Sequence, residues 1–126
     1  MSFLPTRDRN YLVEKGISFE EVQADGQRGL IFHTYALPGG HLNPARADLL
    51  ILLPPGYADV PPDMFYFLPW VRLAANNNFP RCADVPQPFA GQTWQRWSRH
   101  SNEWRPGIDG IWTMLKRVEN ALRLAA

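Results

Sequence analysis

The run ADLLILLP, residues 47–54, is the stretch of sequence that most constrains the fold. It is almost continuously apolar, which is the pattern of a strand that is buried on both faces. Such a strand lies inside a sheet and needs a neighbour on each side. The sequence before and after it should therefore supply further strands.

Candidate strands precede and follow this central run. FEEVQAD at 19–25 alternates weakly, and LIFHTYAL at 30–37 follows after the turn signal Asp25-Gly26. Beyond the Pro/Gly loop PPGYADVPPD, MFYFL at 64–68 is predicted to be a fourth strand. Together these segments predict a four-stranded antiparallel meander.

A helix is predicted at each end of the meander. TRDRNYLVEK at 6–15 can form a short helix, with Thr6 as its N-cap and Gly16 as its stop. A longer helix is predicted from about residue 108 to residue 124, with Lys116, Arg117 and Arg123 in its later turns suiting the helix dipole. Its apolar residues recur at the 3.6-residue period: Ile108, Ile111, Trp112, Leu115, Val118 and Leu122.

Regular structure is hard to find between residues 69 and 106. The run Asn76-Asn77-Asn78 and the prolines from 80 to 88 predict an extended loop. Loops of this length are uncommon in compact domains and are often functional. The expected fold is therefore α+β: an N-terminal helix, the meander, a long irregular segment and a C-terminal helix, in a single domain over residues 1–126.

The composition narrows the class of protein. The hydrophobic set makes up 45% of the 126 residues and charged residues 20%, which is typical of a globular chain. A net charge of +1 gives no electrostatic basis for nucleic-acid binding. No apolar run is long enough to cross a membrane, and the N-terminal sequence MSFLPTRDRN lacks the apolar core of a signal peptide. We therefore expect a cytoplasmic protein.

The segment QTWQRWSRHSNEWRP, residues 92–106, mixes aromatic and basic side chains. It contains Trp94, Trp97, Trp104, Arg96, Arg99, Arg105 and His100. Such a segment is either a wedge packed under the fold or the wall of a site. In the second case Trp97, Arg96 and Arg99 would bind a carboxylate or an acidic partner. In the first, the arginines stack on the tryptophans and pair with acidic residues of the domain.

Three side chains are candidates for catalysis. Cys82 follows Arg81, whose charge favours a thiolate, although a small apolar loop residue is the alternative. His100 can serve as a base, as a neutral donor, or as a structural residue that binds loop carbonyls. Ser98, two residues away, would be a hydroxyl nucleophile if the geometry allows.

No cofactor or metal is expected. The single cysteine excludes an internal disulfide and a multi-cysteine metal site. His33 and His41 match no metal-binding spacing.

Several of these motifs together resemble a known fold. Pro54-Pro55-Gly56-Tyr57, Pro61-Pro62 and the strand at 64–67 look like a strand, a turn and the next strand of the ubiquitin-conjugating (UBC) fold. Trp104-Arg105-Pro106-Gly107 looks like its Trp-x-Pro step into a helix. Over residues 5–124, the set LPPGY, VPPDMFY, WQRWSRH and WRPG is similar to prokaryotic UBC family E. The resemblance implies a bacterial conjugation system with a ubiquitin-like protein, a ThiF-type activating enzyme and a JAB-type isopeptidase.

The sequence departs from the pattern of conjugating enzymes at the active site. The His-Pro-Asn motif is absent, and the nearest text is Asn76-Asn77-Asn78-Phe79-Pro80. The positions just before the Trp-x-Pro step, from Gln95 to Ser98, hold no cysteine. Cys82 stands 22 residues before Trp104 (104 − 82), which is too early unless the intervening loop is rebuilt. His100 stands near the expected site.

Three hypotheses follow from this combination. In the first, the protein is an active conjugating protein in which Cys82 forms a thioester or Ser98 an oxyester, with His100 as base or orienting group. Asn77 or Asn78 would then supply an amide to the oxyanion. In the second, it is a catalytically inactive UBC variant that acts as a binding or adaptor module. In the third, it is a structural domain in which the Trp/Arg segment only packs the long loop.

Overall fold

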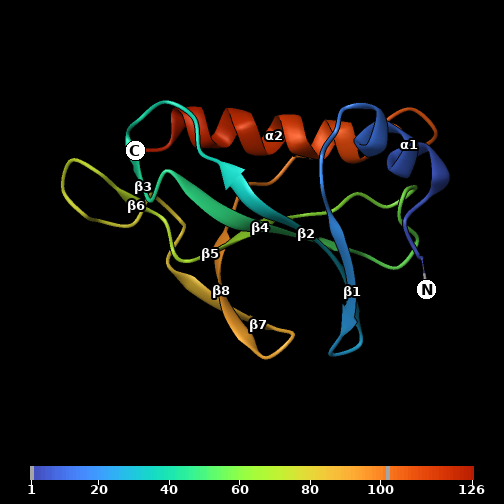
Figure 1. Ribbon diagram of the computed structural model, residues 1–126, viewed down its shortest axis with the longest axis horizontal. Helices are drawn as coiled ribbons and strands as arrows, with labels where there is room; N and C mark the ends of the chain where they lie inside the picture. Colours follow the sequence, from blue (N-terminus) through green and yellow to red (C-terminus); the bar gives the residue numbers. More distant parts are fainter. Residues whose placement is uncertain (1, 102) are drawn as a thin grey trace.

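The structure is a computed structural model that describes residues 2–101 and 103–126. Within this part of the chain, a helix near each end accompanies a curled antiparallel sheet (Figure 1). The helices are α1, Thr6–Glu14, and α2, Ile111–Leu124. The main sheet has the order β1-β2-β4-β5-β8-β7, and a short pair, β3 and β6, lies beside it. The strands are β1 (Glu20–Ala24), β2 (Gln27–Ala36), β3 (Leu42–Asn43), β4 (Arg46–Leu53), β5 (Phe65–Leu68), β6 (Arg72–Leu73), β7 (Val85–Phe89) and β8 (Gln92–Trp97).

The central strand and its neighbours lie where the sequence predicts them. The run at 47–54 forms most of β4, and Leu49, Leu50 and Ile51 in it are completely buried. Strand β4 pairs with β2 on one side and with β5 on the other, both antiparallel. The α+β class and the two terminal helices are therefore confirmed.

The strand count and the long irregular segment were predicted wrongly. Residues 85–97 form a β7–β8 hairpin, and β8 pairs with β5, so the meander continues into a six-stranded sheet in the described chain. Strand β7 has a neighbour on one side only. An edge strand tolerates proline, because the missing N–H can face away from the ladder. Pro86 and Pro88 in β7 are therefore compatible with a strand, although they read as loop residues in the sequence.

Both helices begin differently from the prediction. Pro5, not Thr6, occupies the N-cap of α1, and no side chain caps its first turn. Helix α2 begins at Ile111 rather than near residue 108, and Ile108 is 55% exposed. The carboxylate of Asp8, buried in α1, accepts a hydrogen bond from the Ile111 N–H at 3.4 Å. An acidic side chain of one helix thus satisfies one backbone N–H in the first turn of the other.

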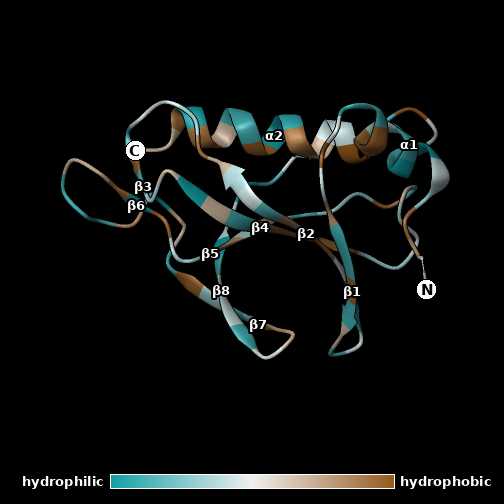
Figure 2. Ribbon diagram, in the orientation of Figure 1, coloured by the Kyte–Doolittle hydropathy of each residue, from teal (hydrophilic) through white to brown (hydrophobic). Residues whose placement is uncertain are grey.

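The core lies mainly between the sheet and α2. Hydrophobic and hydrophilic residues alternate along α2 (Figure 2), and its buried residues pack on one face of the sheet. A smaller cluster covers the opposite face. Its buried members are Ile31, Leu50, Tyr66, Phe89 and Trp94.

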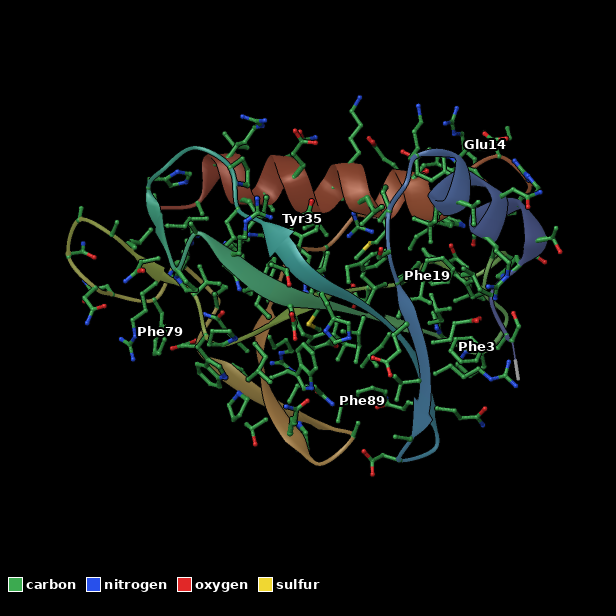
Figure 3. The ribbon with its side chains drawn as sticks, viewed as in Figure 1. Phe3, Glu14, Phe19, Tyr35, Phe79 and Phe89 are labelled. Carbon is green, nitrogen blue, oxygen red and sulfur yellow. The ribbon has the colours of Figure 1, made fainter. Side chains whose placement is uncertain are left out.

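The sheet curls so that its two outer hairpins approach each other. The N–H of Ala90, in the β7–β8 turn, donates to the Asp25 carboxylate in the β1–β2 turn at 2.9 Å. Phe89 lies between these hairpins (Figure 3). A Cβ added at Gly29 of β2 would lie 2.9 Å from Cζ of Phe89 and 2.8 Å from Cδ1 of Leu50. The absent side chain at Gly29 therefore allows the curl.

Substitution Gly29→Ala is expected to lower the free energy of unfolding by roughly 1–3 kcal/mol, the usual range for overpacking. Equilibrium urea unfolding measures the effect. In a Phe89→Leu background, which shortens the ring that clashes, the same substitution should cost less than it does in the wild type. Equal costs in both backgrounds would mean that Phe89 does not limit the space at Gly29.

Candidate active site

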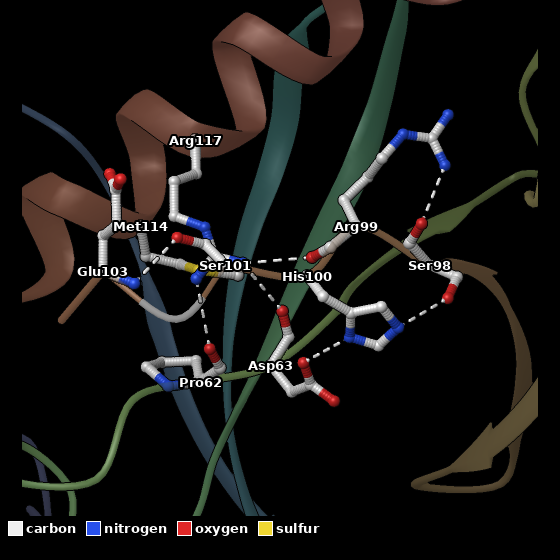
Figure 4. Close-up of polar contacts among 9 residues, drawn as sticks. All are labelled: Pro62, Asp63, Ser98, Arg99, His100, Ser101, Glu103, Met114 and Arg117. Atoms are coloured by element: carbon white, nitrogen blue, oxygen red, sulfur yellow. Dashed lines mark hydrogen bonds and ion pairs between the residues drawn. The ribbon is translucent and has the colours of Figure 1, made fainter.

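The end of β8 and the loop before β5 bring three polar side chains into one hydrogen-bonded chain (Figure 4). Oγ of Ser98 lies 3.1 Å from Nε2 of His100, and Nδ1 of His100 lies 2.8 Å from Oδ1 of Asp63. The register of the sheet explains the meeting. Phe65 of β5 pairs with Trp97 of β8, so residues just before β5 and just after β8 leave the sheet at the same edge.

The carboxylate sets the roles of the two imidazole nitrogens. An ionised Asp63 can only accept a hydrogen bond, so Nδ1 of His100 carries the proton and donates it. Nε2 of the neutral ring is then free to accept from the hydroxyl of Ser98. This is the order of nucleophile, base and orienting carboxylate found in serine acyl transfer. The side chains of His100 and Asp63 are each 62% exposed, so solvent reaches the site.

Cys82 lies beside Ser98. The Ser98 N–H donates to the Cys82 carbonyl oxygen at 3.0 Å, and the cysteine is exposed. The β7–β8 hairpin begins shortly after Cys82 and ends at Trp97, just before Ser98. Because the two strands of the hairpin are antiparallel, the backbone of Cys82 lies next to that of Ser98 although 15 residues separate them along the chain (97 − 82). The described hydrogen bonds of the His100 ring nonetheless go to Ser98 and Asp63.

A buried amide holds the two sides of this site together. Gln95 is completely buried, and its Nε2 donates to the carbonyl oxygens of Val71 and Ala83, both at 2.8 Å. Its Oε1 accepts from the Val71 N–H at 2.8 Å and from the Trp97 indole N–H at 3.0 Å. Ala83 follows Cys82 and Trp97 precedes Ser98. Gln95 therefore holds the backbone of Ala83, next to Cys82, and the indole of Trp97, next to Ser98.

Arg117 of α2 fixes the other members of the site. Its guanidinium donates to the carbonyl oxygens of Pro62 at 3.3 Å, Asp63 at 3.2 Å and Arg99 at 3.0 Å (Figure 4). Partial burial lowers the pKa of this guanidinium, and the three carbonyl dipoles offset the lost hydration. One side chain thus joins the segment that carries Asp63 to the segment that carries His100.

The aromatic and basic residues at 94–99 lie partly in the core and partly at the surface. Trp97 is completely buried, stacked on Phe65 at a centroid distance of 5.6 Å, so it packs the core. The Arg99 guanidinium lies over the Trp97 ring at 5.2 Å and donates to the Ser98 carbonyl oxygen at 3.0 Å. Burial lowers the pKa of Arg99. Arg96 is half-buried, and its Nε has no hydrogen-bond partner among the described residues.

Asn77 and Asn78 lie in an exposed turn after β6. The Leu73 N–H donates to the Asn78 carbonyl oxygen at 2.7 Å, and the Asn77 N–H donates to the Leu73 carbonyl oxygen at 2.8 Å. This turn projects from the end of the molecule where β3 and β6 pair (Figure 1). No hydrogen bond in the described chain joins either asparagine to His100.

The other histidines have polar partners of their own. His33 lies 2.8 Å from a Glu20 carboxylate oxygen and 3.2 Å from one of Asp48, and the bonds to these carboxylates raise the pKa of His33. Nε2 of His41 lies 2.9 Å from the Leu122 carbonyl oxygen. No group of three or more metal-binding side chains occurs in residues 2–101 and 103–126. Over the same residues, no helix is both long enough and apolar enough to span a membrane.

Asp109 ties the segment before α2 together. It accepts hydrogen bonds from the Arg105 N–H, the Arg105 guanidinium and the Thr113 hydroxyl. The bonds from Arg105 are the main reason that the pKa of Asp109 falls to about 2. An aspartate in an unfolded chain has a pKa near 3.9. The contribution of Asp109 to the stability of the folded protein is therefore complete above about pH 4 and is lost as the pH falls from about 4 towards 2.

The Asp109→Asn variant is accordingly expected to lose this acid-dependent component. The melting temperature of the wild type should fall more steeply than that of the variant between about pH 4 and pH 2, whereas the two profiles should be parallel above about pH 5. Thermal scans by circular dichroism across this range measure both profiles. The exposed Asp84→Asn is the matched control and should keep the wild-type slope. A wild-type slope in Asp109→Asn would contradict the assignment.

The motifs on which the resemblance rests also contact each other. The Trp104 indole N–H donates to the Ala58 carbonyl oxygen at 2.8 Å, and the Tyr57 and Trp104 rings lie 6.2 Å apart. The proline-rich turn before β5 is thereby attached to the step into α2.

The chain has an α+β fold with two terminal helices and an antiparallel sheet, and its sequence defines an E2-like protein. The sequence model of prokaryotic E2 family E matches residues 4–125, and the chain belongs to that family. No curated protein matched the chain, and no solved structure did so.

Proposed function

We propose that this protein receives and transfers a ubiquitin-like protein in a bacterial conjugation system, and that the reaction takes place at the cluster of Ser98, His100, Asp63 and Cys82. Family membership supports a role in a conjugation system. One structural observation supports the proposed reaction site. That observation is the hydrogen-bonded chain from Ser98 through His100 to Asp63. The fold that we propose for it is UBC-like, in a single domain over residues 1–126.

Two nucleophiles fit this reaction. A conjugating protein accepts an activated acyl group and needs a side chain that attacks a carbonyl carbon. Ser98 has the better geometry, because His100 is in position to take its proton. Cys82 has the more nucleophilic atom, and its backbone lies against that of Ser98. Intact-mass analysis of variants that lack one or the other nucleophile separates them.

The surrounding residues would serve the acyl group or its carrier. The Arg99 guanidinium donates to the Ser98 carbonyl oxygen and would bring a positive charge to the neighbourhood of the cluster, where it would attract an acidic group of the carrier. Arg96 has an unpartnered buried Nε in the described structure and would bind an acidic group of the carrier. Asn77 or Asn78 can donate an amide only if their turn approaches the cluster when a partner binds.

The expected partners follow from the family resemblance. They are a ubiquitin-like protein, a ThiF-type activating enzyme and a JAB-type isopeptidase, in the bacterial cytoplasm. We expect the first two to act directly before this protein in the transfer sequence.

The test is intact-mass analysis after incubation with ATP and with a candidate activating enzyme and ubiquitin-like protein. The wild type is compared with Cys82→Ala, Ser98→Ala and His100→Ala. We expect a covalent adduct in the wild type, lost in one of the two nucleophile variants and slowed in His100→Ala. Sensitivity of the adduct to thiols would indicate a thioester, and resistance to them an oxyester.

One observation favours a second candidate function. The 62% exposure of both His100 and Asp63 leaves the cluster open to solvent, as in a surface that binds a partner. In that case the protein is an inactive variant that acts as an adaptor. The absence of any adduct, with the activating enzyme shown to load its own cysteine, would establish this alternative.

A further inference from the structure

We infer that Asp63, His100 and Ser98 form a serine acyl-transfer relay that hydrolyses small activated esters through an acyl-Ser98 intermediate. This activity uses the site of the proposed function, but it needs neither the ubiquitin-like protein nor the activating enzyme. Asp63 is a positioning residue in this relay, since its carboxylate orients the imidazole of His100.

The relay is already assembled in the structure. The two distances, 3.1 Å and 2.8 Å, are hydrogen-bond distances that require no rotation of the imidazole. The backbone of Ser98 is bonded to Cys82, and the carbonyl oxygens of Asp63 and Arg99 are bonded to Arg117. Each member of the relay therefore stands on, or next to, a segment that is held in place by other contacts.

Acylation and hydrolysis at Ser98 require only the ester and water. Oγ of Ser98 attacks the carbonyl carbon, and its proton passes to Nε2 of His100. The C–O bond to the leaving group breaks, which releases an alcohol or phenol that takes the proton and leaves an acyl-Ser98 ester. Water then attacks that ester with His100 again as the base. The carboxylic acid leaves and the Ser98 hydroxyl is restored.

The site favours small and highly activated substrates. The Ser98 N–H is already bonded to Cys82, so it cannot stabilise an oxyanion as the N–H of a nucleophilic serine often does. The Arg99 guanidinium donates to the Ser98 carbonyl oxygen, on the other side of that residue from the hydroxyl that meets His100 (Figure 4), so the described contacts supply no ready donor for an oxyanion. The exposed side chains of His100 and Asp63 leave the site open to the water needed for deacylation. We therefore expect slow turnover, and a good leaving group should be needed for acylation.

The experiment uses the full chain with p-nitrophenyl acetate and follows release of nitrophenolate. The wild type should give a burst close to one equivalent and then slow turnover, with an acetyl group mapped to Ser98 by peptide mass spectrometry. Ser98→Ala and His100→Ala should reduce the burst to the level of buffer. Asp63→Asn should slow acylation by roughly ten- to hundredfold, within the range usual for acid–base catalysis. Ser101→Ala, in the same loop but outside the relay, should match the wild type.

Two outcomes would overturn the relay. The first is acetylation of Cys82 with a burst that survives Ser98→Ala, because the thiol would then be the nucleophile. The second is a wild-type protein that gives no burst and does not react with a fluorophosphonate, a reagent for activated serines. Melting curves of every variant exclude unfolding as the cause of a loss.

This result is independent of the result for the conjugation assay. A burst at Ser98 without an adduct of the ubiquitin-like protein would support the relay and count against the proposed function. An adduct on Cys82 without a burst would support the proposed function and overturn the relay.

Discussion

The Gln95→Leu variant is expected to lose about 3–5 kcal/mol of unfolding free energy. Leucine matches the size of glutamine but cannot replace its bonds to Val71, Ala83 and Trp97. A buried polar group left without a partner costs roughly 1–3 kcal/mol, and four such groups surround this side chain. The expected loss is smaller than the sum for four unpaired groups, because the backbone near the exposed Cys82 can relax and bond to water. It still lies near the upper limit of single-substitution effects.

Urea unfolding of Gln95→Leu beside Gln87→Leu measures this effect. Gln87 lies in the neighbouring strand β7, is half-exposed, and makes one described side-chain bond, to the Pro88 carbonyl oxygen. Its replacement should change the free energy of unfolding by no more than about 0.5 kcal/mol. Equal stabilities of the two variants would show that the buried amide is not a structural centre. Faster alkylation of Cys82 by iodoacetamide in Gln95→Leu would show in addition that the amide holds the Cys82 loop.

The Trp97→Ala variant is expected to cost roughly 3–5 kcal/mol, the range for removing a large aromatic ring from a core. The ring is completely buried, stacked on Phe65 and edge-on to Phe67 at 5.7 Å. Its indole N–H also supplies one of the bonds to Gln95. The cavity left behind would lie in the main core, at the residue that precedes Ser98 in the chain.

The control for Trp97→Ala is Trp70→Ala. Trp70 is half-buried, contacts Phe79 at 5.4 Å and donates to the Thr93 carbonyl oxygen. Its loss should cost clearly less than the loss of Trp97, because less of the ring leaves water on folding. Differential scanning calorimetry of both variants gives the comparison. If Trp97→Ala melted like the wild type but failed to bind a partner, the ring would belong to a binding surface instead of the core.

Local sequence pattern was sufficient for the elements whose burial follows a simple period. The apolar run of β4 and the turn at Asp25-Gly26 lie where the pattern predicts them, and so does the stripe along α2 from Ile111 onwards, although its predicted first member, Ile108, lies outside the helix. It failed for the β7–β8 hairpin. Pro86 and Pro88 read as loop residues, and only the position of β7 at the edge of the sheet makes them acceptable in a strand.

Only the Ser98 and His100 part of the candidate site was predictable from the sequence. Ser98 and His100 are two residues apart, so their possible pairing is visible in the sequence. Asp63 precedes β5, and its meeting with His100 depends on the pairing of β5 with β8, which no local pattern reveals. Arg117 read only as a basic residue in a late helical turn. Its three bonds to carbonyl oxygens have no signal in the sequence, because any residue can supply a carbonyl.

The order of strands in the sheet has a consequence for synthesis on the ribosome. Strand β5 is followed in space by β8, which is made about two dozen residues later. A nascent chain that ends before β8 therefore presents β5 as an open edge that carries the apolar residues Phe65, Tyr66 and Phe67. Open apolar edges promote association between chains. We therefore expect association between chains to be favoured while synthesis stands between β5 and β8, and the pairing of β8 with β5 closes this edge.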